Sequence, residues 1–263
     1  MAAVLAVGAG AALAVLALTK PGSSAPVSVS ADGARAAAWV AGQVSPATVV
    51  SCDPAMCGQL RRDGFPAARL LALGPASRDP LGSGVVIATA AVRADFGAEL
   101  GSDYAPLVIA GFGAGPDRIE VRAVAPDGPA ALAAQLSAQR TSLAAAGRQL
   151  LRNPTVQASA AARSDLMAGH VDGRLLANLS VLSSQQPISL VAFDAAAPGA
   201  SPAVPLRGVQ LAAAPASYRS AILAFLRAQR GTYRAAVAAS GTDGHGQPVV
   251  IVRFDIPEPL SAP

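Results

Sequence analysis

Hydrophobic and polar residues follow two periods along the chain, and the period predicts the element that each segment forms. Apolar residues that recur every three or four positions predict helices, and short runs rich in Val, Ile and Leu predict strands. In the first half we expect helices at 33–43, 54–63, 90–99 and 103–111, and strands at 47–51, 69–73, 84–88 and 118–125. Strands that alternate with helices indicate a small three-layer α/β domain with a mainly parallel sheet.

The second half begins with a long predicted helix at 129–152, which ends at Asn153-Pro154 because proline cannot continue it. We then expect strands at 155–158, 188–193 and 206–213, and helices at 160–169, 173–185 and 216–229. A final hairpin should pair 232–239 with 248–255 around a glycine-rich turn at 241–246. This pattern predicts a helix-linked α+β domain with a C-terminal β-hairpin.

These elements divide the chain into five predicted parts. They are a transmembrane signal anchor at 1–20, a linker at 21–35, an α/β domain at 36–127, a connecting helix at 128–152 and an α+β domain at 153–263. The linker is expected to be flexible because its residues are small and polar.

Residues 2–19 carry neither charge nor proline, and Lys20-Pro21-Gly22 ends the run. Eighteen helical residues span about 27 Å, close to the thickness of the hydrocarbon core of a bilayer. An uncleaved signal anchor is the first interpretation, a cleaved signal peptide the second and a buried soluble helix the third. The membrane is therefore a predicted partner through residues 2–19, although missing basic flanks leave the orientation open.

The chain has two cysteines, Cys52 and Cys57, in the segment VVSCDPAMCGQL. Asp53 is a good helix N-cap and Pro54 suits the first helical position, so the cysteines flank a strand-to-helix turn. A disulfide here would fit an oxidising, extracytoplasmic compartment. Two buried free thiols are the alternative, and a redox or metal role is less favoured because the spacing is not Cys-x-x-Cys.

Composition argues against a nucleic-acid partner. Charged residues make up 14% of the chain and the net charge is +4, but the arginines are scattered and only Arg61-Arg62 are adjacent. A polybasic arm is therefore absent from the sequence, and aromatic residues, at 4%, are too few for a base-stacking platform.

Few residues suit acid–base or metal chemistry. His170 and His245 are the only histidines, and we expect both in turns rather than in a catalytic site. Asp53 is expected to cap a helix, and Asp194 and Arg207 to pair across neighbouring strands. The glycines at 111–115 precede a strand, whereas a dinucleotide loop lies between a strand and a helix. We therefore predict no catalytic residue, no bound metal and no cofactor.

One segment resembles a known type of domain. The stretch AAAWVAGQVSPATVVSCDPAMCGQLRRDGFPAARLLAL is similar to the start of small extracytoplasmic domains in actinobacterial membrane proteins, some of which follow the spans of lipid-linked sugar transferases. The resemblance covers residues 33–127, and the matching positions are Trp39, Val49, Val50, Leu60, Gly64, Leu70, Leu71, Thr89, Arg93, Phe96 and Gly97. The multiple spans of those transferases are missing from this sequence, so their activity is not implied.

A second resemblance covers residues 149–193, which look like the leading part of actinobacterial domains related to the D-alanyl-D-alanine carboxypeptidase (M15-like) fold. In those domains a Ser-x-His-x-x-Gly-x-Ala-x-Asp element that binds zinc follows. Here the next residues are DAAAPGASPAVPLRGVQLAA, which contain no histidine. The resemblance therefore implies a domain without its zinc ligands.

Together these features predict a non-catalytic protein in the cell membrane, with a single span and an extracytoplasmic body. It would bind or scaffold a cell-envelope component, with an envelope protein or a glycan as the partner. The alternative is an accessory or degenerate enzyme of cell-wall carbohydrate or peptidoglycan metabolism. A transport-coupled accessory subunit is a third class, because a glycine- and alanine-rich anchor can pack against other helices.

Overall fold

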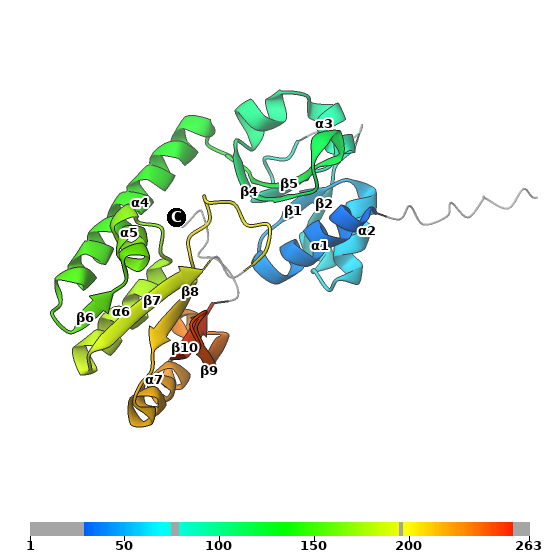
Figure 1. The fold of residues 1–263 in the computed structure, drawn as a ribbon. Coiled ribbons are helices and arrows are strands. Elements are labelled where there is room, and N and C mark those ends of the chain that lie inside the picture. The colour runs from blue at the N-terminus through cyan, green and yellow to red at the C-terminus, as the bar shows by residue number, and fades with distance from the viewer. Residues whose placement is uncertain (1–28, 75–78, 195–196, 255–263) are drawn as a thin grey trace, which may run out of the picture.

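The computed structural model describes residues 29–74, 79–194 and 197–254. It is a mixed α/β protein with two five-stranded sheets, one in each of two lobes (Figure 1). We call residues 29–127 the first lobe and residues 129–254 the second lobe. The predicted anchor at 2–19 lies outside the described residues, and within the described ranges no helix is both long and apolar enough to cross a membrane.

The sheet of the first lobe has the strand order β2-β1-β3-β5-β4. Its strands are β1 Val50–Cys52, β2 Leu70–Ala72, β3 Val85–Ala88, β4 Leu107–Phe112 and β5 Ile119–Ala123. Strand β1 is parallel to β2 and to β3, whereas β5 is antiparallel to β3 and to β4. The sheet is therefore mixed, and the prediction of a mainly parallel sheet is wrong for its β3-β5-β4 half.

The reason for this difference is the segment 103–111, which we predicted as a helix. The structure has one irregular helical turn at Leu100–Tyr104 and then strand β4. Residues 107–112 read LVIAGF, a short apolar run of a kind that periodicity alone does not assign to helix or strand. A short connection returns the chain to β5, and such a connection makes neighbouring strands antiparallel.

Helices cover both faces of this sheet, which confirms the three-layer arrangement. The helices are α1 Ala31–Gln43, α2 Pro54–Arg62 and α3 Ala90–Phe96. Helices α1 and α2 pack on one face with Val50, Ile87 and Val121, and α3 packs on the opposite face with Val86 and Ala88.

Helix α1 begins earlier than the predicted linker at 21–35 allows. It starts at Ala31, because the Ser30 side chain accepts a hydrogen bond from the Gly33 backbone N–H at 3.1 Å and caps the helix. Gly33, Ala36 and Ala37 are buried against the core of the first lobe, so the small residues of this segment allow α1 to pack closely. The boundary of the linker therefore falls before residue 31.

The second lobe follows the predicted order of elements closely. Its strands are β6 Val156–Ala158, β7 Ile188–Asp194, β8 Gly208–Ala212, β9 Val237–Thr242 and β10 Pro248–Arg253, and its helices are α4 Pro129–Arg152, α5 Ala160–Ala168, α6 Gly173–Gln185 and α7 Ala216–Ala228. The strand order is β6-β7-β8-β10-β9, parallel only between β6 and β7. The predicted C-terminal hairpin is confirmed as β9–β10, although its first strand begins at Val237 rather than at residue 232.

Helices α4 and α5 cross at very short range because small residues meet there. A Cβ atom added to Gly147 would lie 2.3 Å from the Leu166 carbonyl oxygen. Gly169, which ends α5 with φ +71°, would place a Cβ atom 2.2 Å from the Arg140 carbonyl oxygen. Glycine at these two positions therefore allows the α5–α6 turn to lie directly against the middle of α4.

The connection between β7 and β8 crosses from the second lobe to the first. The Gly111 N–H on β4 donates to the Gly199 carbonyl at 3.0 Å, and the Ser201 N–H donates to the Ile109 carbonyl at 2.9 Å. Val204 from the same connection is buried in the core of the first lobe. In Figure 1 this yellow segment reaches toward β4, so it covers an edge of the first sheet that would otherwise be open.

Candidate functional site

The predicted disulfide is confirmed. Cys52 at the end of β1 and Cys57 in α2 are bonded, with their Cα atoms 5.4 Å apart, and both residues are buried. The bond spans the strand-to-helix turn that Asp53 caps, since its carboxylate accepts the Met56 N–H at 2.9 Å. The pair therefore fixes the start of α2 against the sheet.

Sequence reasoning missed a contact beside this turn. The Thr89 hydroxyl donates to the other carboxylate oxygen of Asp53 at 2.5 Å. Thr89 caps α3 as Asp53 caps α2, and the two residues follow neighbouring parallel strands, where ligands of open α/β sheets often bind. Here each of the two side chains bonds the other and also caps a helix. The contact therefore joins α2 and α3, which cover opposite faces of the sheet.

The two histidines lie in different turns of the second lobe, as predicted. His245 is exposed in the β9–β10 turn, where the Asp243 carboxylate accepts the backbone N–H groups of His245 and Gln247, each at 2.8 Å. Those two backbone hydrogen bonds lower the pKa of the Asp243 carboxyl. His170 lies in the α5–α6 turn, with its Nδ1 atom 3.7 Å from an Asp165 carboxylate oxygen.

Asp194 at the end of β7 and Arg207, which immediately precedes β8, are neighbours, as predicted. The backbone N–H of Arg207 donates to the backbone carbonyl of Asp194 at 3.2 Å. The Asp194 carboxylate is 3.4 Å from Arg253 Nη2. The buried Arg207 side chain also contacts the Gln43 amide oxygen at the end of α1. These polar contacts tie the second sheet to the first lobe.

A largely buried ion pair lies at the start of α6. The Asp172 carboxylate, which is fully buried, caps the helix and lies 2.7 Å from Arg174 Nη2. The Arg174 guanidinium is also 5.1 Å from the centre of the Phe254 ring, a cation–π distance. The pair therefore holds α6 against the end of β10.

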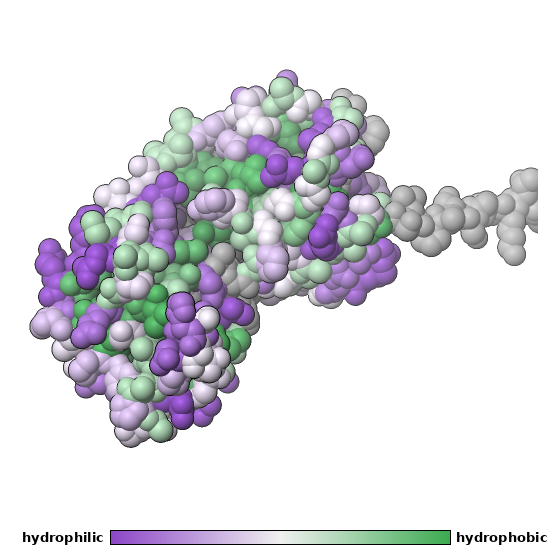
Figure 2. Space-filling view, viewed as in Figure 1, coloured by the Kyte–Doolittle hydropathy of each residue, from purple (hydrophilic) through white to green (hydrophobic). Residues whose placement is uncertain are grey.

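Two adjoining hollows lie where α4 meets the first lobe, and we call them together the groove. Leu107, Leu136 and Arg140 line both hollows, whose volumes are about 40 and 490 Å³. The start of β4, the α5–α6 turn and residues 202–205 form the wall opposite α4. Figure 2 shows hydrophobic atoms in green at this junction of the lobes.

The groove has an apolar floor and a basic rim. Leu107, Leu136 and Leu143 provide the floor, and Arg140, Arg148 and His170 are the basic side chains that line it. No Asp or Glu lines either hollow in the part of the chain that the structure describes. The geometry therefore suits an elongated molecule with an anionic end and an apolar body.

The arginines lie on one side of α4. Positions 140 and 148 are eight residues apart, which on an α-helix is about 12 Å along the axis and about 80° around it. Helix α4 carries no acidic residue that could pair with them at the next turn.

The backbone of His170, on the opposite wall of the groove, is held on both sides, since its N–H donates to the Asp165 carbonyl and its carbonyl accepts the Leu206 N–H.

Sequence reasoning did not find the groove, because its walls come from distant segments. The sequence predicts a helix at Leu107, whereas in the structure this residue begins strand β4 and lines the groove together with α4. Arg140 and Arg148 read as ordinary surface residues of a long helix. A usable signal was the absence of acidic residues from all 24 residues of α4, which is unusual for an exposed helix.

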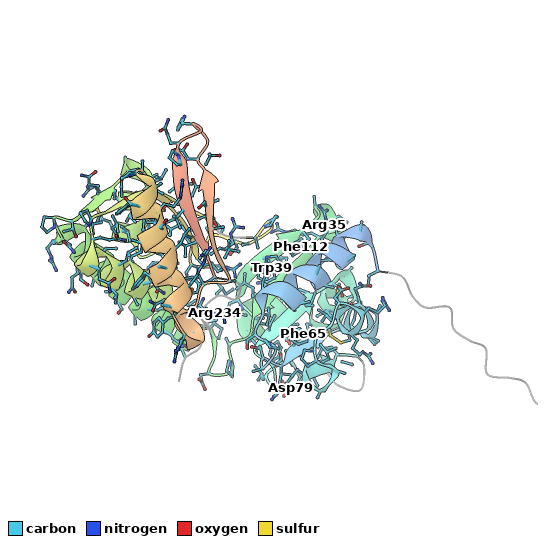
Figure 3. All side chains as sticks on the ribbon, turned by 90° about the horizontal axis from the view of Figure 1, so that it is seen from below. Arg35, Trp39, Phe65, Asp79, Phe112 and Arg234 are labelled. Carbon is cyan, nitrogen blue, oxygen red and sulfur yellow. A yellow bond between two sulfur atoms is a disulfide. The ribbon has the colours of Figure 1, made fainter. Side chains whose placement is uncertain are left out.

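Comparisons with protein-family models, with curated proteins and with solved structures find no match to this chain. Among the described residues, no group of three or more His, Cys, Asp or Glu side chains is arranged to hold a metal ion. The side chains of Trp39 and Phe112 form an aromatic edge contact, with ring centres 6.4 Å apart. This contact lies on the side of the first lobe that faces the second (Figure 3).

Proposed function

We propose that the protein is a non-catalytic, membrane-tethered extracytoplasmic protein that binds or scaffolds a component of the cell envelope. The observation that carries the binding part is the groove, a preformed hollow with an apolar floor and a basic rim. Mixed linings of this kind are typical of ligand sites, in which apolar side chains supply contact area and a few polar groups fix orientation.

Two observations support the location. Residues 2–19 are long and apolar enough to span a bilayer. The Cys52–Cys57 disulfide fits an oxidising compartment, because cytosolic thiols are kept reduced in most organisms.

Two reporters fused separately after Pro263 test the location. Alkaline phosphatase, which needs its own disulfides, should be active, and a fluorescent protein that folds only in the cytosol should be dark. Deletion of residues 2–19 should reverse both signals and serves as the control. An active fluorescent reporter on the full chain would overturn the proposal.

The thiols give an independent measurement. Alkylation of the unfolded protein without reductant should leave its mass unchanged, and alkylation after reduction should add two labels, one for each of Cys52 and Cys57. Two labels without reductant would contradict the extracytoplasmic location.

A further inference from the structure

We infer that the groove binds the phosphate-bearing headgroup of an anionic lipid, with the start of the acyl chains on the leucine floor. This inference rests on the proposed membrane-tethered function and names its ligand class. Three features of the groove support it: the charge of the rim, the apolar floor and the rigidity of the walls.

The charge of the rim selects an anion. Arg140 and Arg148 are exposed, line the groove and face no acidic side chain in its lining. A guanidinium presents a planar fork of N–H donors that matches the oxygens of a phosphate. His170, beside Arg140, has an exposed side chain (46%) with Asp165 as its acidic neighbour. Arg140 is therefore the central contact for the phosphate, and Arg148 adds attraction further along α4.

The floor selects an amphiphile rather than a free phosphate. Leu107, Leu136 and Leu143 are half-buried, so they present apolar surface to the groove. Burial of that surface favours binding and is available only to a ligand with hydrocarbon next to its charge. A protein tethered at the bilayer surface meets such ligands at high local concentration.

The walls are held in place without a ligand. Gly169 abuts the backbone of Arg140, and the Ser201 hydroxyl donates to the Val108 carbonyl at 2.7 Å, next to Leu107. The rim and the floor therefore belong to segments fixed by backbone contacts. Such pre-organisation lowers the entropy that binding costs.

The test uses the full chain in a non-ionic detergent and isothermal titration calorimetry. The probe is dihexanoyl phosphatidylglycerol, with dihexanoyl phosphatidylcholine as the zwitterionic comparison and glycerol phosphate as the headgroup alone. We expect saturable binding of phosphatidylglycerol that weakens as salt is raised, and much weaker binding of the two comparison compounds.

Variants separate the groove from general attraction. Arg140→Gln and Arg148→Gln should each weaken phosphatidylglycerol binding about fivefold, whereas Arg227→Gln on α7, an exposed arginine outside the groove, should leave it unchanged. Leu136→Gln should weaken binding of the lipid without changing that of glycerol phosphate. Thermal unfolding of each variant verifies that it is folded.

Three results would overturn the inference. Equal binding of phosphatidylcholine would remove the role of charge, and equal binding of glycerol phosphate would remove the role of the floor. Unchanged binding in Arg140→Gln and Arg148→Gln would place the lipid elsewhere. Each of these results leaves the reporter and thiol measurements intact, so failure of the ligand and failure of the proposed location are distinguishable.

Discussion

The α4–α5 crossing makes a sharp prediction for Gly147→Ala. Gly147 is an internal residue of α4, where replacing glycine by alanine normally stabilises a helix by about 1 kcal/mol. At this position the added Cβ atom would lie 2.3 Å from the Leu166 carbonyl oxygen and 2.8 Å from its carbonyl carbon. Both atoms belong to the backbone of α5, so no side-chain rotation relieves the overlap.

The magnitude follows from the distance. A carbon and an oxygen atom in contact are normally more than about 3 Å apart, so α4 and α5 must separate by nearly 1 Å. Overpacking of this kind costs about 1–3 kcal/mol, and it disturbs the core of the second lobe, to which Leu150 of α4 and Leu166 of α5 both belong. After the gain of about 1 kcal/mol in helix propensity, we expect a net loss of up to about 2 kcal/mol in the free energy of unfolding.

The assay is urea unfolding of the full chain followed by circular dichroism, with Gly58→Ala as the matched control. Gly58 is also internal to a helix, but the nearest atom to its added Cβ is the end of the Arg62 side chain at 3.8 Å. The control should gain about 0.5–1 kcal/mol. If Gly147→Ala is as stable as Gly58→Ala, the close approach of α4 and α5 is not real.

Further predictions concern the disulfide, a turn and the connection between the lobes. Replacing Cys52 and Cys57 together by alanine should lower the free energy of unfolding by about 2 kcal/mol, the loop-closure value for so short a ring, measured by urea unfolding against the oxidised parent. The lowered pKa of Asp243 means that its carboxylate stabilises the hairpin above the unfolded pKa of 3.8 and that this contribution is lost as the pH falls through the folded value. The advantage of the parent over Asp243→Asn in thermal unfolding should therefore shrink between about pH 6 and about pH 2.5, and a constant difference would contradict the assignment. Gly199→Ala, at φ +88° and with its Cβ 2.7 Å from the Phe112 ring, should speed hydrogen exchange of the Gly111 amide, whereas an unchanged rate would refute the contact.

Local signals predicted most of the elements correctly. Ser159, Asp172 and Thr89 cap helices through their own side chains, and Gly169 ends α5 in the left-handed conformation, so these boundaries depend on neighbouring residues only. The exception was β4, where an apolar run without alternation fits a buried helix as well as a strand. Its pairing with β5, not its own sequence, makes it a strand.

The groove was beyond sequence reasoning for a different reason. Its lining combines Leu107 from β4, Arg140 from α4 and His170 from a turn, which are brought together only by tertiary contacts. The disulfide was predictable because Cys52 and Cys57 are five residues apart across a turn whose cap and proline are visible in the sequence. Sites built within one turn can be predicted locally, and sites built between lobes cannot.

The connection that carries Gly199 and Val204 limits how the protein can be divided into independent fragments. A cut at Gly128 divides the sequence between the two lobes, yet the upstream piece would lose the strand-like cover of β4 and expose an unpaired, apolar sheet edge. Such a fragment should self-associate when produced alone, whereas both fragments produced together should reassemble. The polypeptide passes between the lobes three times, so hinge opening about a single joint is not available to it.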